Sequence, residues 1–294
     1  MSLYSQAESN IRKTWGFLIL FFIFVIFLGW IISYFYNEPL ILWLAVFFSF
    51  FSVFFSYWHS DKIILRMNNA RLVEEKDNPE IYNLVNNLCT VAGLPLPKIY
   101  IIEDEQPNAF ATGRNPKHAV IAVTRGLLKK LDKLELEGVI AHELAHIGNR
   151  DMLLQTIVVV LVGTIIMMTD FFFFSSFGGR GRQGGHPIFL IIFLALMILA
   201  PIFAQLMKLA ISRKREFLAD ASGALLTRYP DGLAKALEKI SQHPSSLAKA
   251  NDSTAHLFIV NPFRGNEGKS WLHRLFMTHP PVEERVRALT GMKI

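Results

Sequence analysis

Long apolar runs and polar blocks follow one another along the chain. Four runs hold only one charged residue between them, Asp170; they are residues 14–37, 39–60, 152–174 and 187–207. Each run is as long as the roughly 20 apolar residues that a helix needs to cross a bilayer. Buried helices of a soluble core do not account for four runs of this length. The pattern therefore predicts four transmembrane helices.

The two polar blocks, residues 61–151 and 208–294, show the shorter patterns of a folded domain. In the first block, short segments rich in apolar and β-branched residues predict strands at residues 98–102, 108–113 and 119–123. The turn-forming residues 114–118 join the last two of these strands, which predicts a hairpin.

Helix signals fill the rest of both blocks. Asn78 before Pro79 is typical of a helix start, and Gly93 is typical of a helix end. We expect Thr278 to cap the final helix, with the prolines that follow it forming the first turn. Further helices are predicted at residues 127–149, 208–228, 231–241 and 280–289.

The positive charge of the chain lies at the edges of the apolar runs. The net charge of +6 alone would also suit a nucleic-acid-binding protein. Lys and Arg, however, precede the first run and follow the second and fourth runs. These residues are Arg12, Lys13, Lys62, Arg66, Arg71, Lys208, Arg213, Lys214 and Arg215. The positive-inside rule then places both termini and residues 61–151 in the cytoplasm, although Arg180 and Arg182 lie in a loop predicted outside. We expect a lipid bilayer and no nucleic acid as partner.

Four parts are therefore expected along the chain. They are a transmembrane hairpin (1–60), the first part of a cytoplasmic domain (61–151), a second transmembrane hairpin (152–207) and the second part of the domain (208–294). The first apolar run is too long for the core of a signal peptide, and no small-residue cleavage pattern follows it. With Cys89 as its single cysteine, the chain can form neither an intrachain disulfide nor a thiolate metal site.

The sequence AHELAHIGN at residues 141–149 matches the pattern H-E-x-x-H. His142 and His146 are four residues apart, so on a helix they share one face and can both reach one metal ion. Glu143 lies about 100° around the helix and can contact a water on that ion. A catalytic zinc site takes a third protein ligand and leaves the fourth position to water. The compact pattern that supplies a third histidine three residues after a glycine is absent here.

A better candidate for the third ligand lies in SRKREFLAD, residues 212–220. Glu216 and Asp220 share one helix face, so Glu216 can bind the metal while Asp220 accepts a hydrogen bond from the outer nitrogen of a ligand histidine. Alone, such a pair is more often a solvated helix face. Here two predicted membrane crossings separate His146 from Glu216, and an even number of crossings returns the chain to the side that it left. The second hairpin would therefore bring both halves of the site to one membrane face.

Taken together, AHELAHIGNRD, REFLAD, PNAFATG and THPPVEERVRAL resemble the signatures of the HtpX-type membrane metalloproteases, relatives of the CAAX prenyl proteases within the gluzincins. The resemblance covers nearly the whole chain, including the order of the four spans. It implies a mainly α membrane protein, with four transmembrane helices plus a cytoplasmic α+β zincin-like metalloprotease domain with a small sheet. It also implies one zinc ion per chain, bound by His142, His146 and Glu216, with Glu143 as the general base.

Three further roles rest on the resemblance. It implies that Asn108 holds the substrate backbone along strand 108–113, that His279 steadies the oxyanion, and that Arg285 lies beside the cleft. From the residues alone, Asn108 could equally close a turn after a proline. His279 and Arg285 are then better explained as a helix cap and a surface charge.

The expected function is that of a zinc metalloendopeptidase. Zinc lowers the pKa of its water toward about 7 and polarises a carbonyl, and Glu143 takes the proton of that water. An exposed edge strand binds an unfolded peptide by strand addition, which reads backbone more than sequence. We expect misfolded or membrane-associated proteins as substrates, in quality control at the cytoplasmic face of the inner membrane of a bacterium. We also expect self-cleavage in the presence of zinc.

Two alternatives stay open at this point. An intramembrane metalloprotease would place its motif in the bilayer, but the charged residues at 129–137 make the helix before the motif interfacial or soluble. A non-catalytic zinc-binding scaffold or transporter would not need Glu143, and it would normally have ionisable residues within its spans, which are almost absent here. Metal analysis and casein hydrolysis, with and without a chelator, separate the enzyme from the scaffold.

Overall fold

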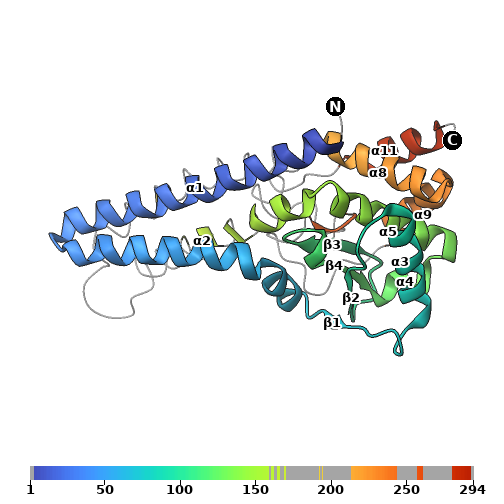
Figure 1. The fold of residues 1–294 in the computed structure, drawn as a ribbon, viewed down its shortest axis with the longest axis horizontal. Helices are drawn as coiled ribbons and strands as arrows, with labels where there is room; N and C mark the ends of the chain where they lie inside the picture. The colour runs from blue at the N-terminus through green and yellow to red at the C-terminus, as the bar shows by residue number, and fades with distance from the viewer. Residues whose placement is uncertain are drawn as a thin grey trace.

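The computed structural model of the chain describes residues 3–158, 213–243, 257–260 and 280–292, together with a few positions between 160 and 194. Two long helices, α1 (Leu3–Tyr36) and α2 (Pro39–Met67), lie side by side as an arm, and the sheet and the remaining helices gather at one end of it (Figure 1). Helix α1 begins well before the apolar run at residue 14. Its first turns are therefore polar, and they lie against the domain.

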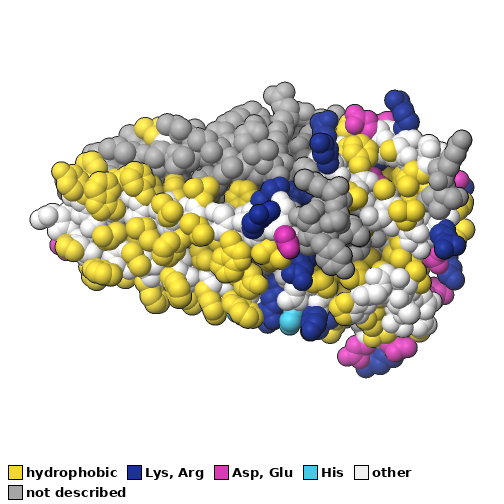
Figure 2. All heavy atoms as spheres, turned by 45° about the horizontal axis from the view of Figure 1, so that its top comes forward, with side chains coloured by type: hydrophobic (Ala, Val, Ile, Leu, Met, Phe, Trp, Pro, Cys, Tyr) yellow, Lys and Arg dark blue, Asp and Glu magenta, His cyan; other side chains and the backbone are white. Residues whose placement is uncertain are grey.

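The surface of the arm is apolar. Trp43 is 70% exposed and Phe47 is 69% exposed, values that helices of a soluble core do not show for such side chains. Both α1 and α2 are long and apolar enough to cross a membrane. Hydrophobic side chains cover the arm, and Lys and Arg side chains gather where the arm meets the domain (Figure 2). The first two predicted spans therefore correspond to α1 and α2, whereas the spans predicted at 152–174 and 187–207 lie largely outside the described residues.

A small mixed sheet forms one side of the domain. Its strand order is β1 (Arg71–Leu72), β2 (Lys98–Ile102), β4 (Ala119–Thr124) and β3 (Ala109–Gly113). Strands β2 and β4 are parallel, and the other two pairs are antiparallel. The predicted strands and the hairpin between β3 and β4 are confirmed, with the short 3-10 turn Pro116–His118 joining them. Strand β3 forms one edge of this sheet, as predicted. All five of its residues are buried, however, so the expectation of an exposed edge strand is wrong for this structure.

The helices that follow the strands begin and end at capping residues. Helix α3 (Pro79–Ala92) starts where predicted, since the side chain of Asn78 accepts a hydrogen bond from the Ile81 backbone, and it ends at Gly93 with a φ of 66°. The single helix predicted at 127–149 is wrong. The chain forms α4 (Arg125–Lys130) and α5 (Lys133–Gly148), because Asp132 caps α5 through a reciprocal pair of hydrogen bonds with Glu135. An N-cap residue has non-helical backbone angles and interrupts the helix.

Three helices complete the described part of the domain: α8 (Arg213–Thr227), α9 (Pro230–Ser241) and α11 (Val282–Thr290). The last of these begins at Val282 after the N-cap Pro281, so the start predicted at residue 280 is two residues too early. Thr278 lies outside the described residues. Helix α5 is central, because it packs against β3, α3, α8 and α9. The apolar side chains between these elements form the main core.

Candidate metal centre

Helices α5 and α8 cross at close range and bring three predicted ligands together. The close approach depends on Gly223, since a Cβ at this position would lie 2.9 Å from the backbone nitrogen of His142. Glu216 precedes Gly223 by two helical turns and so lies on the same face of α8. His142, His146 and Glu216 are all buried, and their ligand atoms lie within 4.8 Å of one another. The packing of α8 on α5 therefore brings Glu216 next to the two histidines, although it lies far from them in the sequence.

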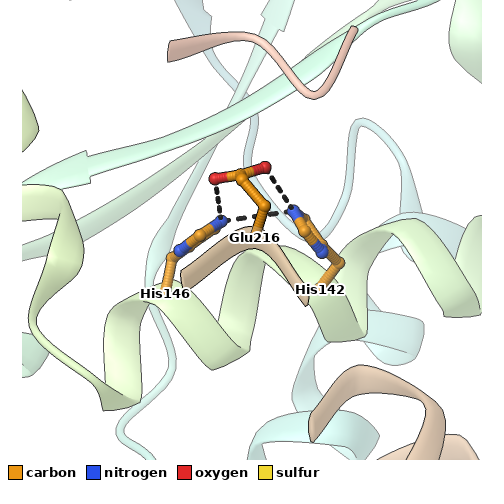
Figure 3. A group of neighbouring side chains, drawn as sticks. All are labelled: His142, His146 and Glu216. Carbon is orange, nitrogen blue, oxygen red and sulfur yellow. Dashed lines mark hydrogen bonds and ion pairs between the residues drawn. The ribbon is translucent and has the colours of Figure 1, made fainter. Parts of the chain in front are cut away.

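The three side chains point at one spot (Figure 3). The Nε2 atoms of His142 and His146 are 3.2 Å apart. The carboxylate of Glu216 lies 3.9 Å from Nε2 of His142 and 3.5 Å from Nε2 of His146. Both histidines project from successive turns of α5, and the glutamate reaches the same spot from α8.

A carboxylate holds the outer nitrogen of each histidine. Nδ1 of His142 is 2.9 Å from Oδ1 of Asp220, and Nδ1 of His146 is 3.2 Å from Oδ2 of Asp151. Because a carboxylate can only accept, both Nδ1 atoms carry hydrogens, and the two Nε2 lone pairs face each other. The carboxylate of Glu216 lies beside these two lone pairs. The three groups repel one another unless a positive charge lies between them. Two imidazoles and a carboxylate are also a ligand set of catalytic zinc sites, so the residues fit this metal.

The pKa values of the two rings are shifted in opposite directions. Burial lowers the pKa of His142 to about 4, although the bond to Asp220 opposes this effect. Burial also lowers the pKa of His146, but the hydrogen bond to Asp151 and the charge of Glu216 outweigh it and raise the value to about 9. The acidic groups around His146 therefore favour a positive charge at this side of the site.

Asp220 is itself held by a buried arginine from the last helix. Nε and Nη2 of Arg285 donate to the two oxygens of Asp220 at 2.8 and 2.6 Å, and Nη1 donates to the carbonyl of Ile259 at 3.0 Å. Burial raises the pKa of Asp220, but the charge and hydrogen bonds of Arg285 outweigh this effect and hold the pKa at about 2. Arg285 is 0% exposed, so its interpretation as a surface charge is wrong. It acts on the site through Asp220 and His142.

Glu143 lies under the edge strand β3. Its side chain is buried, and burial raises its pKa to about 7, partly offset by the charge of His146 and by a hydrogen bond from the backbone of Ala111. A carboxyl group with this pKa both accepts and returns a proton near neutral pH. The raised pKa of Glu143 suits its predicted role as general base, which stays a prediction.

Asn108, at the start of β3, binds a segment of the chain itself. Its side-chain nitrogen donates to the carbonyl of Val260 at 2.8 Å, and its oxygen accepts from the Val260 nitrogen at 3.4 Å. The nitrogen of Ile259 also donates to the carbonyl of Ala109 at 3.0 Å. Asn108 thus does more than close a turn, and its contact with a substrate stays a prediction. The other predicted residue of this region, His279, lies outside the described residues.

The sequence does not predict that Asp151, Asn10 or Arg215 contributes to the metal centre. Asp151 lies beyond the end of α5, where helical spacing no longer relates it to His146. Its position in the quoted stretch AHELAHIGNRD was the one available signal. Arg215 has the same kind of signal, because it is the first residue of the quoted stretch REFLAD. Asn10 shows no pattern that separates it from other polar residues near a membrane edge.

These features together are typical of a metallopeptidase. One helix carries two histidines and a glutamate, a second helix carries a further acidic residue, and an edge strand lies beside them. Residues 75–293 match the model of peptidase family M48. The chain is 44% identical to the Protease HtpX homolog of Dictyoglomus thermophilum, over 99% of this chain and 95% of that protein. It is 48% identical to the Protease HtpX homolog of Thermococcus kodakarensis, over 88% and 89% of the two chains. The chain belongs to peptidase family M48 and is a membrane metalloprotease, which confirms the expected HtpX-type family.

A solved structure shares the fold. The crystal structure of S. mikatae Ste24p superposes with a TM-score of 0.52 over 97% of this chain and 67% of that chain, at 20% sequence identity. This likeness covers the arm as well as the domain, since nearly all of the present chain is matched.

Proposed function

We propose that the chain is a zinc endopeptidase that cuts misfolded or membrane-associated proteins at the cytoplasmic face of the cytoplasmic membrane. The observation that carries the proposal is the convergence of Nε2 of His142, Nε2 of His146 and the carboxylate of Glu216, with both outer nitrogens held by carboxylates. Family membership supports the peptidase activity.

His142, His146 and Glu216 would hold one zinc ion per chain. When bound there, zinc polarises a substrate carbonyl and makes a water acidic enough to attack it near neutral pH. Asp220 and Asp151 keep both rings in the tautomer that offers Nε2, and their hydrogen bonds make the rings stronger ligands.

Glu143 is proposed as the general base. It accepts a proton from the attacking water and passes it to the departing amine, and burial, which raises the pKa of this carboxyl group, makes it a stronger base for the first step. The hydrogen bond from Ala111 ties Glu143 to β3, so the base and the edge strand keep a fixed relation.

A substrate is proposed to add as a strand along β3, with His279 as the donor that stabilises the oxyanion. For Asn108 to hold one end of the substrate, Val260 must first release the side-chain amide that it binds. Binding through backbone hydrogen bonds would accept many sequences, which suits misfolded proteins. Self-cleavage is part of the same proposal, because such a site does not distinguish the chain's own exposed loops.

The proposed topology has four spans, with both termini and the divided domain (residues 61–151 and 208–294) in the cytoplasm. The basic side chains between the arm and the domain support this orientation. The position of the site in the domain, at the end of the arm, argues against an intramembrane protease (Figure 1).

The decisive experiment compares Glu143→Gln with Glu216→Ala in full-length protein purified in detergent. Glu143→Gln should keep about one zinc per chain and lose casein hydrolysis, because an amide cannot accept the proton. Glu216→Ala should lose zinc and hydrolysis together. Zinc is measured by elemental analysis after dialysis, and folding by circular dichroism.

The proposal fails if Glu216→Ala keeps stoichiometric zinc and normal cleavage, since the third ligand would then be wrong. It fails equally if Glu143→Gln cuts casein at the wild-type rate. The half-buried Glu137→Gln, on the same helix as Glu143 but outside the metal centre, should behave as wild type and serves as the matched control.

A further inference from the structure

The first membrane helix contacts residues of the metal centre through one buried side-chain amide, that of Asn10. Asn10 of α1 is 3% exposed, and all of its side-chain hydrogen-bonding groups are used. Its Nδ2 donates to Oδ1 of Asp151 at 2.7 Å and to the carbonyl of Asn149 at 3.2 Å. Its Oδ1 accepts from Nη1 of Arg215 at 2.9 Å.

These partners lie at the ends of the two helices that carry the predicted ligands. Asn149 is the C-cap of α5, and Asp151 follows it and accepts from His146. Arg215 is in the first turn of α8, directly before Glu216. One side chain of the arm therefore joins the end of α5 to the start of α8.

The carboxylate of Asp151 is fixed at both oxygens. Oδ2 faces Nδ1 of His146, while Oδ1 faces Asn10 at 2.7 Å and Nη1 of Arg215 at 3.5 Å. Asp151 is 0% exposed, so water does not compete for these bonds. Without Asn10, Oδ1 would lose its shortest hydrogen bond, and the carboxylate could rotate away from His146.

Asparagine suits this position because it donates to a carboxylate and accepts from a guanidinium without adding a charge. Leucine has a similar size but would remove all three bonds and leave buried polar groups without them, which is costly. Aspartate would place a second carboxylate beside Asp151. The arrangement parallels the other ligand, where Arg285 fixes the carboxylate that holds His142.

We propose that Asn10 is a positioning residue of the metal centre: it fixes His146 through Asp151 and aligns the start of α8 through Arg215. The first membrane helix is then part of the metal site as well as an anchor. This inference rests on the proposed zinc site.

The test measures metal affinity of the full-length protein in detergent by competition with a chromophoric chelator. Asn10→Leu should weaken zinc binding by about 10–100-fold, the usual effect of losing a group that orients a ligand. It should also change the visible absorption of the cobalt-substituted protein, because the geometry at His146 changes. Thr14→Val is the matched control: Thr14 is buried one turn further along α1 and bonds only the backbone oxygen of Asn10 among the contacts described. It should bind zinc like the wild type.

A double-mutant cycle distinguishes positioning from general destabilisation. If Asn10 acts through Asp151, the loss of affinity in Asn10→Leu/Asp151→Ala should be clearly smaller than the product of the two single losses. Full additivity, or a change of less than threefold in Asn10→Leu, would overturn the inference. Asn10→Ser replaces the leucine variant if circular dichroism of the metal-free protein shows lost helix. Should the wild type and Glu216→Ala bind zinc equally, the proposed site itself would fail, which is a separate outcome.

Discussion

Arg285 shows why the type of cation matters at a single residue. Its planar guanidinium binds both oxygens of Asp220 and the Ile259 carbonyl at once, in a place with no solvent contact. A lysine ammonium is a point donor and cannot form this paired geometry. Asp220 would then be free to turn, and with it the ring of His142.

Arg285→Lys should therefore lower zinc affinity by about 10–100-fold while the charge at the position is kept. The measurement is competition with a chelator on the full-length protein, with peptidase activity as a second readout. Arg287→Lys is the control, because Arg287 is exposed on the same helix. Equal zinc affinity of Arg285→Lys and the wild type would show that the guanidinium fork has no role at the site.

At the same scale, the sequence predicts those residues of the site that share a helix. The four-residue spacings of His142 with His146 and of Glu216 with Asp220 define faces, and these faces meet in the structure. Asp151 could not be predicted in this way, because it follows the end of α5. Its contact with His146 depends on the path of the chain after the helix, which no periodicity describes.

Among the elements, the pair of α5 and α8 determines whether a third ligand can reach the site. Gly223 permits their close approach, since a Cβ there would be 2.9 Å from one backbone atom of His142 and 3.2 Å from another. Backbone cannot move aside as a flexible side chain can. A methyl group at this position would push α8 away from α5 and carry Glu216 with it.

Gly223→Ala should thus lower zinc affinity by about tenfold or more, even though alanine is favoured over glycine in a helix by about 1 kcal/mol. The outcome is read from zinc affinity together with the melting temperature of the metal-free protein. Gly148→Ala on α5 is the matched control, because its Cβ would meet only a side-chain atom of Leu94 at 3.9 Å. Unchanged affinity in Gly223→Ala would mean that the helix spacing tolerates the methyl group.

The elements themselves were largely predictable, because short strands between turns and capped helices are local features. The break between α4 and α5 was missed, since a charged, leucine-rich stretch reads as one helix. The decisive feature was the reciprocal capping of Asp132 and Glu135, which is also local and could have been used. The angle at which α8 packs on α5 cannot be predicted from such a local sequence pattern.

At the scale of the whole molecule, the orientation in the membrane follows from charge. Lys62, Arg66 and Arg71 lie at the domain end of α2, and the turn between α1 and α2 carries no Lys or Arg. From this asymmetry the positive-inside rule predicts that the domain lies in the cytoplasm, as proposed. The apolar arm alone does not set this direction, because it is equally apolar in both orientations.

Reporter fusions test this orientation in the intact membrane. Green fluorescent protein fused after Lys76, in the exposed loop before α3, should fluoresce, and alkaline phosphatase at the same position should stay inactive. A fusion after Asn37, between α1 and α2, is the matched control and should give the opposite pair of results. Active phosphatase after Lys76 would reverse the proposed topology.

The buried network at the metal centre contains residues from distant parts of the chain: Asn10, His142, His146, Glu216 and Arg285. These residues are therefore synthesised one after another, and the network is complete only after the last of them. A ribosome adds His146 to the chain well before Arg285, and at about 5–20 residues per second the interval is roughly 7 to 28 seconds. During that interval the emerging chain has its two histidines but lacks the carboxylate of Glu216 and then the guanidinium that fixes Asp220. If these residues have the proposed roles, a nascent copy should be inactive beside other nascent membrane proteins. We expect the ability to cut to appear only after the chain has grown past residue 285.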